Sequence, residues 1–308
     1  MDKFKQFLVS SNFEFYIDFD LSQISSMRLG KKVKLAVFPK SEIELEKILL
    51  KIYSLKLKFK VLGNLSNVLI IGDDSNVFIV TSKMSEEIEF KGNRVRVSSG
   101  VLLPKFCEVV RKNGLKGIEG LIGIPACVGG AIVNNAGAFG YSISNCLESV
   151  KVFSDGEIFD ILKSEIKFLH HHSNLNRFVI LEATFLFENE NEYDIINLTN
   201  KFTYLRGKTQ PLGLSLGSVF KKVNGMSAGF YIERSGLKGF RIGGIMVSNK
   251  HANFFVNDKG GSTTDFLRLL AFVQVQVEKQ FGVWLVPEIE KVGDINETFS
   301  RSSHSFEI

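Results

Sequence analysis

The feature that most constrains this chain is the glycine-rich loop at residues 114–140, which carries eight glycines among 27 residues and only two charged side chains. Glycine weakens helices and strands, so this density indicates backbone with positive φ or backbone that closely approaches another group. The Gly129-Gly130-Ala131 segment leaves backbone N–H groups uncovered by side chains, and such groups bind phosphates or flat polar rings. A glycine-rich packing loop is the alternative. The length of the run, with Asn134-Asn135-Ala136-Gly137 attached, favours a cofactor-binding loop.

A second candidate phosphate-binding segment lies nearer the N-terminus. Residues 34–71 predict a strand-helix-strand unit and a further strand, with Ser41 and Glu44 as a capping box at the start of the helix. The turn after the second strand is Gly63-Asn64-Leu65-Ser66-Asn67, whose hydroxyl and amide groups can bind a diphosphate. Leu65 is unfavourable there if the backbone needs positive φ. A plain hairpin turn is the alternative.

Both segments resemble the FAD-binding signatures of the UDP-N-acetylenolpyruvoylglucosamine reductase family, flavoenzymes that make UDP-N-acetylmuramate for bacterial peptidoglycan. The loop is similar to the family's central signature, with Ala126 and Phe139 where members usually have glycine and tyrosine, and the turn is similar to a GGGSN loop. The likeness extends from about residue 25 to residue 293. It implies an FAD site formed by Gly63, Asn64, Ser66, Asn67, Gly123, Ile124, Pro125, Val128, Gly129, Gly130, Ala131, Asn135, Gly137 and Arg206.

Two further motifs of this family supply candidate catalytic residues. Residues 217–220 resemble the G-S-x-F motif, whose serine protonates the substrate carbon, and this role falls on Ser218. A hydroxyl can donate that proton when a relay and a developing carbanion favour the transfer. Residues 285–289 resemble L-E-P-E-V, with Val286 in place of the first glutamate, and Glu288 is the catalytic one. A partly buried glutamate with a raised pKa could stabilise the aci-carboxylate intermediate, whereas a solvated surface carboxylate is the alternative.

The largest departure from the family lies at residues 168–173, Phe-Leu-His-His-His-Ser, where members usually show F-x-Y-R-x-S. This likeness places His171 on the arginine that holds the substrate carboxylate. Imidazolium supplies a positive charge only when protonated and offers no bidentate fork. If the segment is a strand, neighbouring side chains point to opposite faces, so only His170 and His172 could converge on a metal. No carboxylate or cysteine is suitably spaced, and we predict no metal site.

Polar residues around the Ser218 motif are candidates for binding the substrate diphosphate or the phosphates of NADPH. For Lys208 and Lys222, ordinary exposed lysines are an equally good interpretation. The span between His172 and Arg206 is too short for the tyrosine-bearing loop of the family's longer type, so the chain resembles the shorter type. The predicted substrate-binding residues are Lys208, Lys222, His251 and Asn253.

Composition restricts the class of protein. Hydrophobic residues make up 44% of the 308 residues and charged residues 23%, as in ordinary globular proteins. The net charge of +5 is spread along the chain, which suits a small anionic substrate better than nucleic acid. Three cysteines show neither metal nor redox spacing and fit a reducing cytosol. We find no signal-peptide shape and no apolar run of about 18 residues, and we expect a soluble, cytoplasmic monomer without membrane or nucleic-acid partners.

We therefore predict an α+β fold with a two-subdomain FAD-binding module of the PCMH/VAO type and an α+β substrate-binding domain. The predicted boundaries are 1–83 and 84–193 for the two FAD-binding subdomains, 194–293 for the substrate domain and 294–308 for a polar tail. The resemblance implies that NADPH reduces FAD and that the reduced flavin gives hydride to the enolpyruvyl carbon. Two alternatives remain: another FAD-dependent oxidoreductase with a different substrate, or a flavin-binding protein whose active site has decayed at His171, Leu65 and Glu290.

Overall fold

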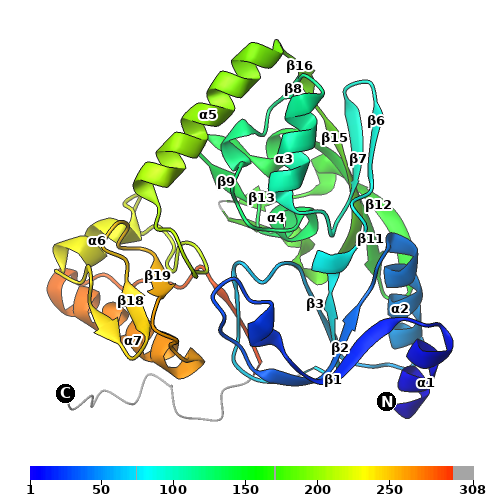
Figure 1. Cartoon of the computed structure of the whole chain (residues 1–308), viewed down its shortest axis with the longest axis horizontal. Coiled ribbons are helices and arrows are strands. Elements are labelled where there is room, and N and C mark those ends of the chain that lie inside the picture. The colour runs from blue at the N-terminus through cyan, green and yellow to red at the C-terminus, as the bar shows by residue number, and fades with distance from the viewer. Residues whose placement is uncertain (74, 170, 294–308) are drawn as a thin grey trace.

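The computed structural model describes residues 1–73, 75–169 and 171–293, so the predicted polar tail at 294–308 lies outside the described residues. Helices and strands are mixed along the chain, and the predicted α+β class is confirmed. Figure 1 shows three lobes: a first lobe at the N-terminus, a second lobe built from the middle of the chain, and a third lobe that follows the long helix α5. None of the described helices is both long and apolar enough to cross a membrane.

The first lobe is built on a four-stranded sheet in the order β1-β2-β5-β3, in which β2 and β3 run parallel to β5 and β1 runs antiparallel to β2. Successive side chains of a strand point to opposite faces, and both faces are buried here. Leu35 and Val37 pack under the two helices, whereas Ala36 and Phe38 pack in a second core on the other face. The elements are α1 Asp2–Ser10, β1 Glu14–Asp20, β2 Lys32–Phe38, α2 Glu42–Ser54, β3 Phe59–Leu62, β4 Val68–Ile70 and β5 Val77–Val80.

The capping box predicted at the start of α2 is only half formed. The Ser41 hydroxyl accepts the Glu44 N–H, as predicted, at 3.2 Å. The Glu44 carboxylate instead accepts the N–H of Lys40 at 2.8 Å. Lys40 precedes the N-cap, so this second hydrogen bond fixes the chain that enters the helix rather than a donor of the helix itself; the Ser41 cap alone places the helix start where the sequence indicates.

The second lobe is built on an antiparallel five-stranded sheet in the order β12-β11-β15-β7-β6. Both hairpins predicted from Gly-Asn and Asp-Gly turns are confirmed as β6-β7 and β11-β12. Helices α3 and α4 cover one face of the sheet and enclose the largest apolar core with it. The elements are β6 Ile88–Lys91, β7 Arg94–Ser98, α3 Leu103–Lys112, α4 Val128–Val133, β11 Leu147–Ser154, β12 Glu157–Leu162 and β15 Val179–Leu186, with short two-stranded pairs β8 Leu115–Lys116 with β16 Glu188–Asn189, β9 Gly137–Ala138 with β10 Tyr141–Ser142, and β13 Phe168–Leu169 with β14 His172–Ser173.

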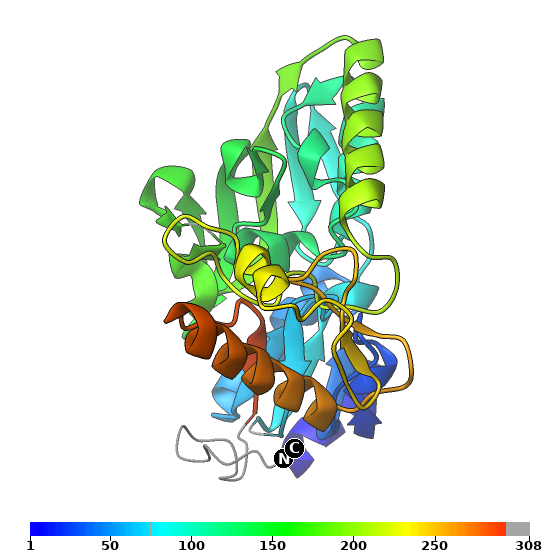
Figure 2. The same cartoon turned by 90° about the vertical axis from the view of Figure 1, so that its left-hand side faces the viewer.

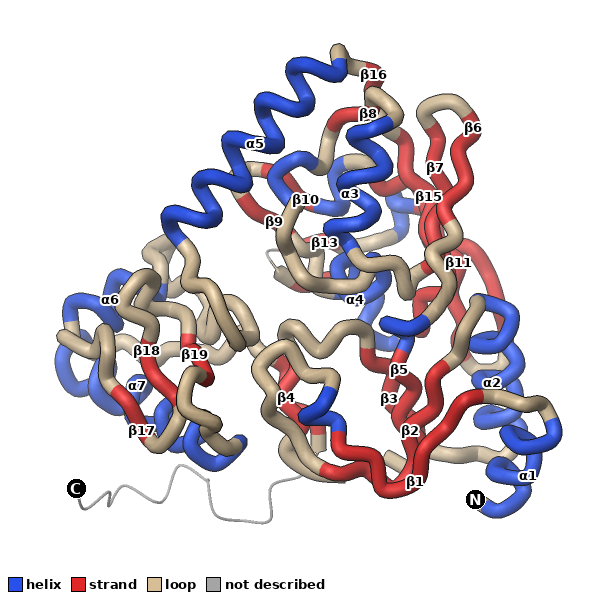
Figure 3. The backbone as a smooth tube through the Cα atoms, viewed as in Figure 1, coloured by secondary structure: helices blue, strands red, loops and turns tan. Residues whose placement is uncertain are grey.

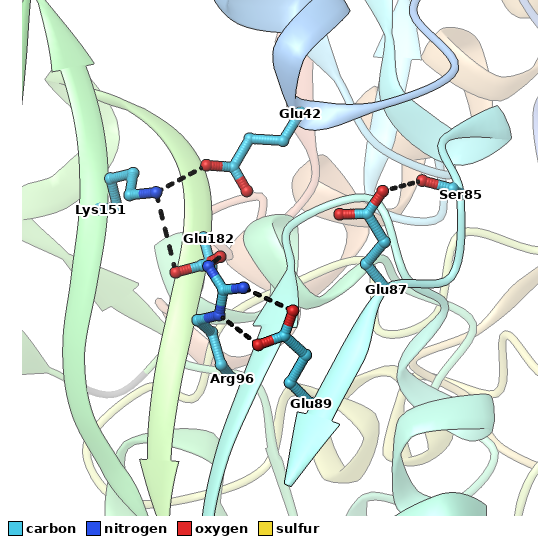
Figure 4. A network of polar contacts seen from close by, with 7 residues as sticks. All are labelled: Glu42, Ser85, Glu87, Glu89, Arg96, Lys151 and Glu182. Carbon is cyan, nitrogen blue, oxygen red and sulfur yellow. Dashed lines mark hydrogen bonds and ion pairs between the residues drawn. The ribbon is translucent and has the colours of Figure 1, made fainter. Parts of the chain in front are cut away.

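A polar network joins the other face of this sheet to α2 of the first lobe (Figure 4). Lys151 on β11 contacts Glu42 at 2.8 Å and Glu182 at 3.9 Å. Arg96 on β7 contacts the same Glu182 at 2.7 Å and also pairs with Glu89. Burial raises the pKa of Glu182 to about 7, against the opposing effect of the two cations. The network therefore ties three strands of the second lobe to the helix that covers the first.

The third lobe has a three-stranded antiparallel sheet, β17-β18-β19, against which α7 packs, and α6 lies next to α7 (Figure 2). Helix α7 begins with a complete capping box between Ser262 and Asp265. Four of the five residues predicted for its apolar stripe are buried, but Phe281 is 37% exposed because it lies in the last turn, just before the left-handed Gly282. The elements are α5 Glu192–Thr209, α6 Ala228–Arg234, β17 Arg241–Ile242, β18 Ile245–Val247, β19 Phe255–Asn257 and α7 Thr263–Phe281.

The chain returns to the first lobe after α7. Strand β20, Glu290–Val292, runs parallel to β4, and Val292 is buried in the first lobe's second core. Figure 3 shows β4 on the side of the first lobe that faces the third. Conversely, Met27, Leu29 and Leu69 are buried in the core of the third lobe. The residues just before β20 therefore lie where the first and third lobes meet. The predicted domain boundaries remain a prediction.

Candidate active site

The glycine-rich loop contains the short helix α4 of the second lobe. Its N–H groups are less open than predicted. The Gly129 N–H donates to the carbonyl of Ser99 at 2.8 Å, and the Ala131 N–H is used inside the helix. Among the described residues, the Gly130 N–H has no hydrogen-bond acceptor, and a Cβ added at Gly130 would meet nothing within 4 Å. One N–H without an acceptor therefore remains of the predicted run among the described residues.

Close packing accounts for several of the other glycines, so both interpretations of the loop hold in part. A Cβ at Gly129 would lie 2.9 Å from the Cβ of Ser99, and one at Gly137 would lie 2.9 Å from the carbonyl oxygen of Tyr141. Gly123 has φ +82°, in the left-handed region that favours glycine. Of the remaining predicted cofactor residues of the loop, Val128 is the first residue of α4, and Ile124, Pro125 and Asn135 lie on either side of this helix.

The 63–67 turn lies against this loop. The Asn64 side-chain amide donates to the carbonyl of Pro125 at 2.8 Å, and a Cβ at Gly63 would lie 3.3 Å from that of Cys127. The hairpin alternative is excluded, because β3 pairs with β5 and β4 pairs with β20. Within the described part of the chain, no side-chain hydrogen bond engages the Ser66 hydroxyl.

Leu65 shows how the turn keeps its path without the family's glycines. Its φ is +46°, in the left-handed region that is sterically unfavourable for leucine. The side chain is only 2% exposed and packs in the first lobe's second core. Burial of a leucine stabilises a protein by about 1.5–3 kcal/mol, which offsets a backbone strain of about 1–2 kcal/mol.

Arg206, on α5, supports the loop from outside. Its guanidinium donates to the carbonyls of Ile122 at 3.0 Å and Gly120 at 3.3 Å. It also lies over the Phe139 ring, 5.2 Å from the centroid. Burial lowers the pKa of this guanidinium, and it takes part in no ion pair among the described residues. Two of its hydrogen bonds are to the backbone of the predicted FAD loop and a third is to the side chain of Gln210, so it helps to fix the shape of that loop.

These residues fit FAD. The 63–67 turn and the loop lie side by side, and between them they offer the Ser66 hydroxyl and the Gly130 N–H. Residues 120–137 contain no acidic side chain, so no carboxylate of this segment opposes a diphosphate. Backbone and hydroxyl donors of this kind are what dinucleotide cofactors use for their phosphates.

Ser218 and Glu288 are carried by adjacent segments of the third lobe. Ser218 forms an antiparallel bridge with Phe254. The next residue, Val219, lies between the segments of Asn253 and Glu288 and bonds to both. The Val219 N–H donates to the carbonyl of Asn253 at 2.8 Å, while its own carbonyl accepts the Glu288 N–H at 2.8 Å. Ser218 is therefore the neighbour of Val219, whose carbonyl binds the Glu288 N–H. The two predicted catalytic residues thus lie on adjacent, hydrogen-bonded segments.

Glu288 is not the solvated surface carboxylate that the alternative required. Its side chain is 16% exposed, and burial raises its pKa to about 7, with Lys221 and Lys222 acting in the opposite direction. Its carbonyl accepts a hydrogen bond from the side-chain amide of Asn67, in the predicted FAD turn, at 3.4 Å. This carboxyl group therefore holds its proton to a higher pH than an ordinary glutamate and can act as a proton or hydrogen-bond donor.

His171 reaches the same carboxylate from the second lobe. Its Nδ1 lies 3.5 Å from Oε1 of Glu288. The expectation of a continuous strand at 168–173 was wrong: β13 and β14 pair as a hairpin, with His171 at its turn at φ +54°. The hairpin is fixed to the glycine-rich loop, because Asn135 donates to the carbonyl of Leu169 at 2.9 Å and the Ser173 hydroxyl donates to that of Val133 at 2.8 Å.

The hairpin also bears on the metal question. His170 lies outside the described residues, so its convergence with His172 is untested. Among the described residues, no group of three or more His, Cys, Asp or Glu side chains could hold a metal ion.

The predicted substrate-binding residues differ in their surroundings. Lys208 and Lys222 are exposed, and Lys222 is near enough to Glu288 to affect its pKa. His251 is half-buried, its Nδ1 accepts the N–H of Asn253 at 3.2 Å, and burial lowers its pKa. Asn253 is 5% exposed and both polar atoms of its amide are engaged by the backbone of Phe220, which favours a structural role over the predicted substrate contact.

Sequence reasoning missed two contributors. Lys221, which also acts on Glu288, differs from Lys222 by no local sequence signal. Asn67, predicted only as a cofactor residue, joins the turn to the segment of Glu288 through its side chain, and through its carbonyl, which accepts the Glu290 N–H at 2.9 Å.

Comparison with known proteins agrees with this geometry. Residues 33–161 match an FAD binding domain, and residues 210–292 match the C-terminal domain of UDP-N-acetylenolpyruvoylglucosamine reductase. The proteins of that name from Caldicellulosiruptor saccharolyticus and Thermotoga maritima are each 35% identical, over 95% and 88% of this chain and 96% of each relative. The crystal structure of the Thermus caldophilus reductase superposes with a TM-score of 0.77 at 29% identity, over 91% of this chain and 98% of that one. The chain belongs to the UDP-N-acetylenolpyruvoylglucosamine reductase family.

Proposed function

We propose that this chain is an FAD-dependent, NADPH-consuming reductase that converts the enolpyruvyl ether of UDP-N-acetylglucosamine to UDP-N-acetylmuramate. Membership of the family and the fit of the 63–67 turn and glycine-rich loop to FAD support this activity. The observation that carries it is the meeting of the Ser218 segment, the half-buried Glu288 and the hairpin residue His171 at one place, between the second and third lobes.

The reaction adds a hydride and a proton across a C=C bond. Bound FAD, once reduced by NADPH, supplies the hydride for the enolpyruvyl carbon. The Ser218 hydroxyl donates the proton to the neighbouring carbon. Before that transfer, negative charge builds on the substrate carboxylate and the carbon beside it, and this charge needs a donor or a cation close by.

Glu288 and His171 supply that stabilisation. In its protonated form Glu288 donates a hydrogen bond to the substrate carboxylate, and its burial keeps this form populated near neutral pH. His171, 3.5 Å from Glu288, replaces the family's arginine as the cation when it is protonated. Lys208 and Lys222 are exposed cations that can bind the substrate diphosphate.

The boundaries 1–83, 84–193 and 194–293 form part of the same proposal, as do a monomeric state and a place in the cytoplasm as an enzyme of cell-wall precursor synthesis. All three cysteines are free thiols, which supports a reducing compartment. The net charge of +5 without a concentrated basic face supports a small anionic substrate rather than nucleic acid.

Absorbance spectroscopy tests the proposal in two steps. The purified protein, supplied with FAD if necessary, should show an oxidised-flavin spectrum that NADPH bleaches under anaerobic conditions. Addition of the enolpyruvyl substrate should then restore the spectrum with one equivalent. Protein that neither carries nor binds FAD would overturn the cofactor assignment. A flavin that NADPH reduces but this substrate does not reoxidise would favour an oxidoreductase with another substrate.

A further inference from the structure

The side chain of Asn253 pairs with the strand that bears Ser218. Its Oδ1 accepts the Phe220 N–H at 3.0 Å and its Nδ2 donates to the Phe220 carbonyl at 2.8 Å. A primary amide has the same donor and acceptor as a peptide group, so it pairs with Phe220 as a neighbouring strand would. Asn253 and Phe220 are both buried. The side-chain amide of Asn253 and the backbone N–H and carbonyl of Phe220 therefore cannot form hydrogen bonds with water instead.

The opposite edge of the same segment holds Glu288. The Val219 carbonyl accepts the Glu288 N–H at 2.8 Å, and the Lys221 N–H donates to the carbonyl of Val286 at 2.8 Å. Residues 218–221 are thus the central strand of a three-segment arrangement, with Asn253 on one edge and Glu288 on the other. A shift of this strand moves Ser218 relative to Glu288.

Asn253 is itself held rigidly. Its N–H donates to Nδ1 of His251 at 3.2 Å, and its main-chain carbonyl accepts the Val219 N–H at 2.8 Å. The loop before it is closed by a hydrogen bond from the Ser248 N–H to the Phe254 carbonyl at 2.8 Å. The amide therefore has one orientation relative to the strand that it contacts.

We propose that Asn253 is a positioning residue, which sets Ser218 at the distance from Glu288 that proton transfer to the substrate carbon requires. The inference rests on the proposed function. Without the amide, the two backbone groups of Phe220 lose their partners and the strand relaxes toward its other edge. A misplacement of about 1 Å in a reacting group can slow a reaction by about 10²-fold, so the effect should fall on the step that uses Ser218.

The chain offers a matched control in Asn257. It is 6% exposed, close to the value for Asn253. Its amide also joins two backbone groups, the carbonyl of Met27 at 3.0 Å and the N–H of Gly261 at 2.7 Å. Neither group belongs to the Ser218 strand. Loss of this amide should disturb folding to a similar degree without displacing Ser218.

The experiment compares Asn253→Leu and Asn257→Leu holoenzymes in the two half-reactions, by stopped-flow absorbance, together with their thermal midpoints and substrate Kd. In Asn253→Leu, flavin reoxidation by the enolpyruvyl substrate should slow about 10–100-fold, while flavin reduction by NADPH and the substrate Kd stay within about twofold. Asn257→Leu should show a similar drop in thermal midpoint, with no selective slowing of flavin reoxidation. A raised Kd at an unchanged reoxidation rate constant would instead make Asn253 a substrate contact.

A second variant keeps the test open if Asn253→Leu does not fold. In Asn253→Asp, an ionised carboxylate would face the Phe220 carbonyl, whereas the protonated carboxyl reproduces the amide's donor and acceptor. The ratio of its reoxidation rate to that of wild type should therefore rise as pH falls. Equal slowing of both half-reactions, a selective loss in Asn257→Leu, or a pH-independent ratio overturns the proposal. Failure of the wild-type enzyme to be reoxidised would refute the proposed function rather than this inference.

Discussion

The ionisation of Glu288 gives the sharpest test of the proposed chemistry. Burial raises the pKa of this carboxyl group from an ordinary 4.5 to about 7, although Lys221 and Lys222 act in the opposite direction. One pKa unit corresponds to about 1.4 kcal/mol, so its ionisation in the folded protein is disfavoured by about 3 kcal/mol. At neutral pH the group is near its midpoint, where small changes of pH alter the fraction that can donate a proton.

The kinetic consequence concerns only the half-reaction with the substrate. Flavin reoxidation should be fastest below pH 7 and fall by about tenfold per pH unit well above it, as Glu288 loses its proton. Glu288→Gln should lower the rate by about 10²–10⁴-fold and remove the part of this limb that Glu288 causes, because an amide does not titrate. Stopped-flow absorbance from about pH 6 to 9 measures both effects, and the rate of flavin reduction by NADPH serves as an internal reference.

The same pKa predicts a change of stability with a definite sign. Because the pKa of Glu288 is higher in the folded than in the unfolded protein, this group contributes its full stability below about pH 4.5. The contribution is lost as pH rises through about 7. The free energy of unfolding of wild type relative to Glu288→Gln should therefore fall by up to about 3 kcal/mol across that range. Denaturant unfolding at about pH 5 and 8 measures the difference, with Glu290→Gln, an exposed carboxylate two residues away, as the control. If the free energy of unfolding of wild type minus that of Glu288→Gln is constant or grows with pH, the reasoning is refuted.

Three further predictions concern single residues. Ser218→Ala should leave flavin reduction by NADPH near wild type and slow reoxidation by about 10²–10⁴-fold, and equal slowing of both half-reactions in stopped-flow traces would make Ser218 structural. His171→Ala should slow reoxidation at every pH, whereas the rate of His171→Arg relative to wild type should rise with pH, because guanidinium keeps its charge; unchanged pH profiles of both variants would make His171 a bystander. Leu65→Ala should lower the free energy of unfolding by about 2–5 kcal/mol, and Leu65→Gly should be the more stable of the two, by about 1 kcal/mol, because φ at residue 65 is +46°; denaturant unfolding that ranks glycine below alanine contradicts this account.

Local signals account for what the sequence predicted well. Helix α7 begins at the Ser262 cap, and the hairpins β6-β7 and β11-β12 follow turns whose residues favour positive φ. The glycine-rich loop was found because its density has few physical causes. Its detail was not, since whether an N–H group such as that of Gly129 is bare depends on Ser99, which the sequence places about 30 residues away.

The failures share a non-local cause. The hairpin at His171 depends on contacts with the glycine-rich loop, and three consecutive histidines carry no turn signal. The parallel pairing of β20 with β4 joins residues at opposite ends of the chain. The hydrogen bonds between the Asn253 amide and Phe220 were likewise not foreseen, because nothing at either position marks the pair. Such contacts follow from the path of the whole chain and not from a window of residues.

The turn that departs from the family also holds the segment of Glu288, the proposed catalytic carboxylate, and this explains how the departures are tolerated. Asn67 contacts the Glu288 carbonyl with its side chain and the Glu290 N–H with its main chain. A change in the path of the turn would therefore displace Glu288 as well as the groups offered to FAD. The path is kept because Leu65 is anchored in a core and the Asn64 amide is bonded to Pro125. Two substitutions that remove the flexibility of glycine thus add contacts on both sides of the turn, and the geometry shared by the FAD site and Glu288 is fixed by those contacts.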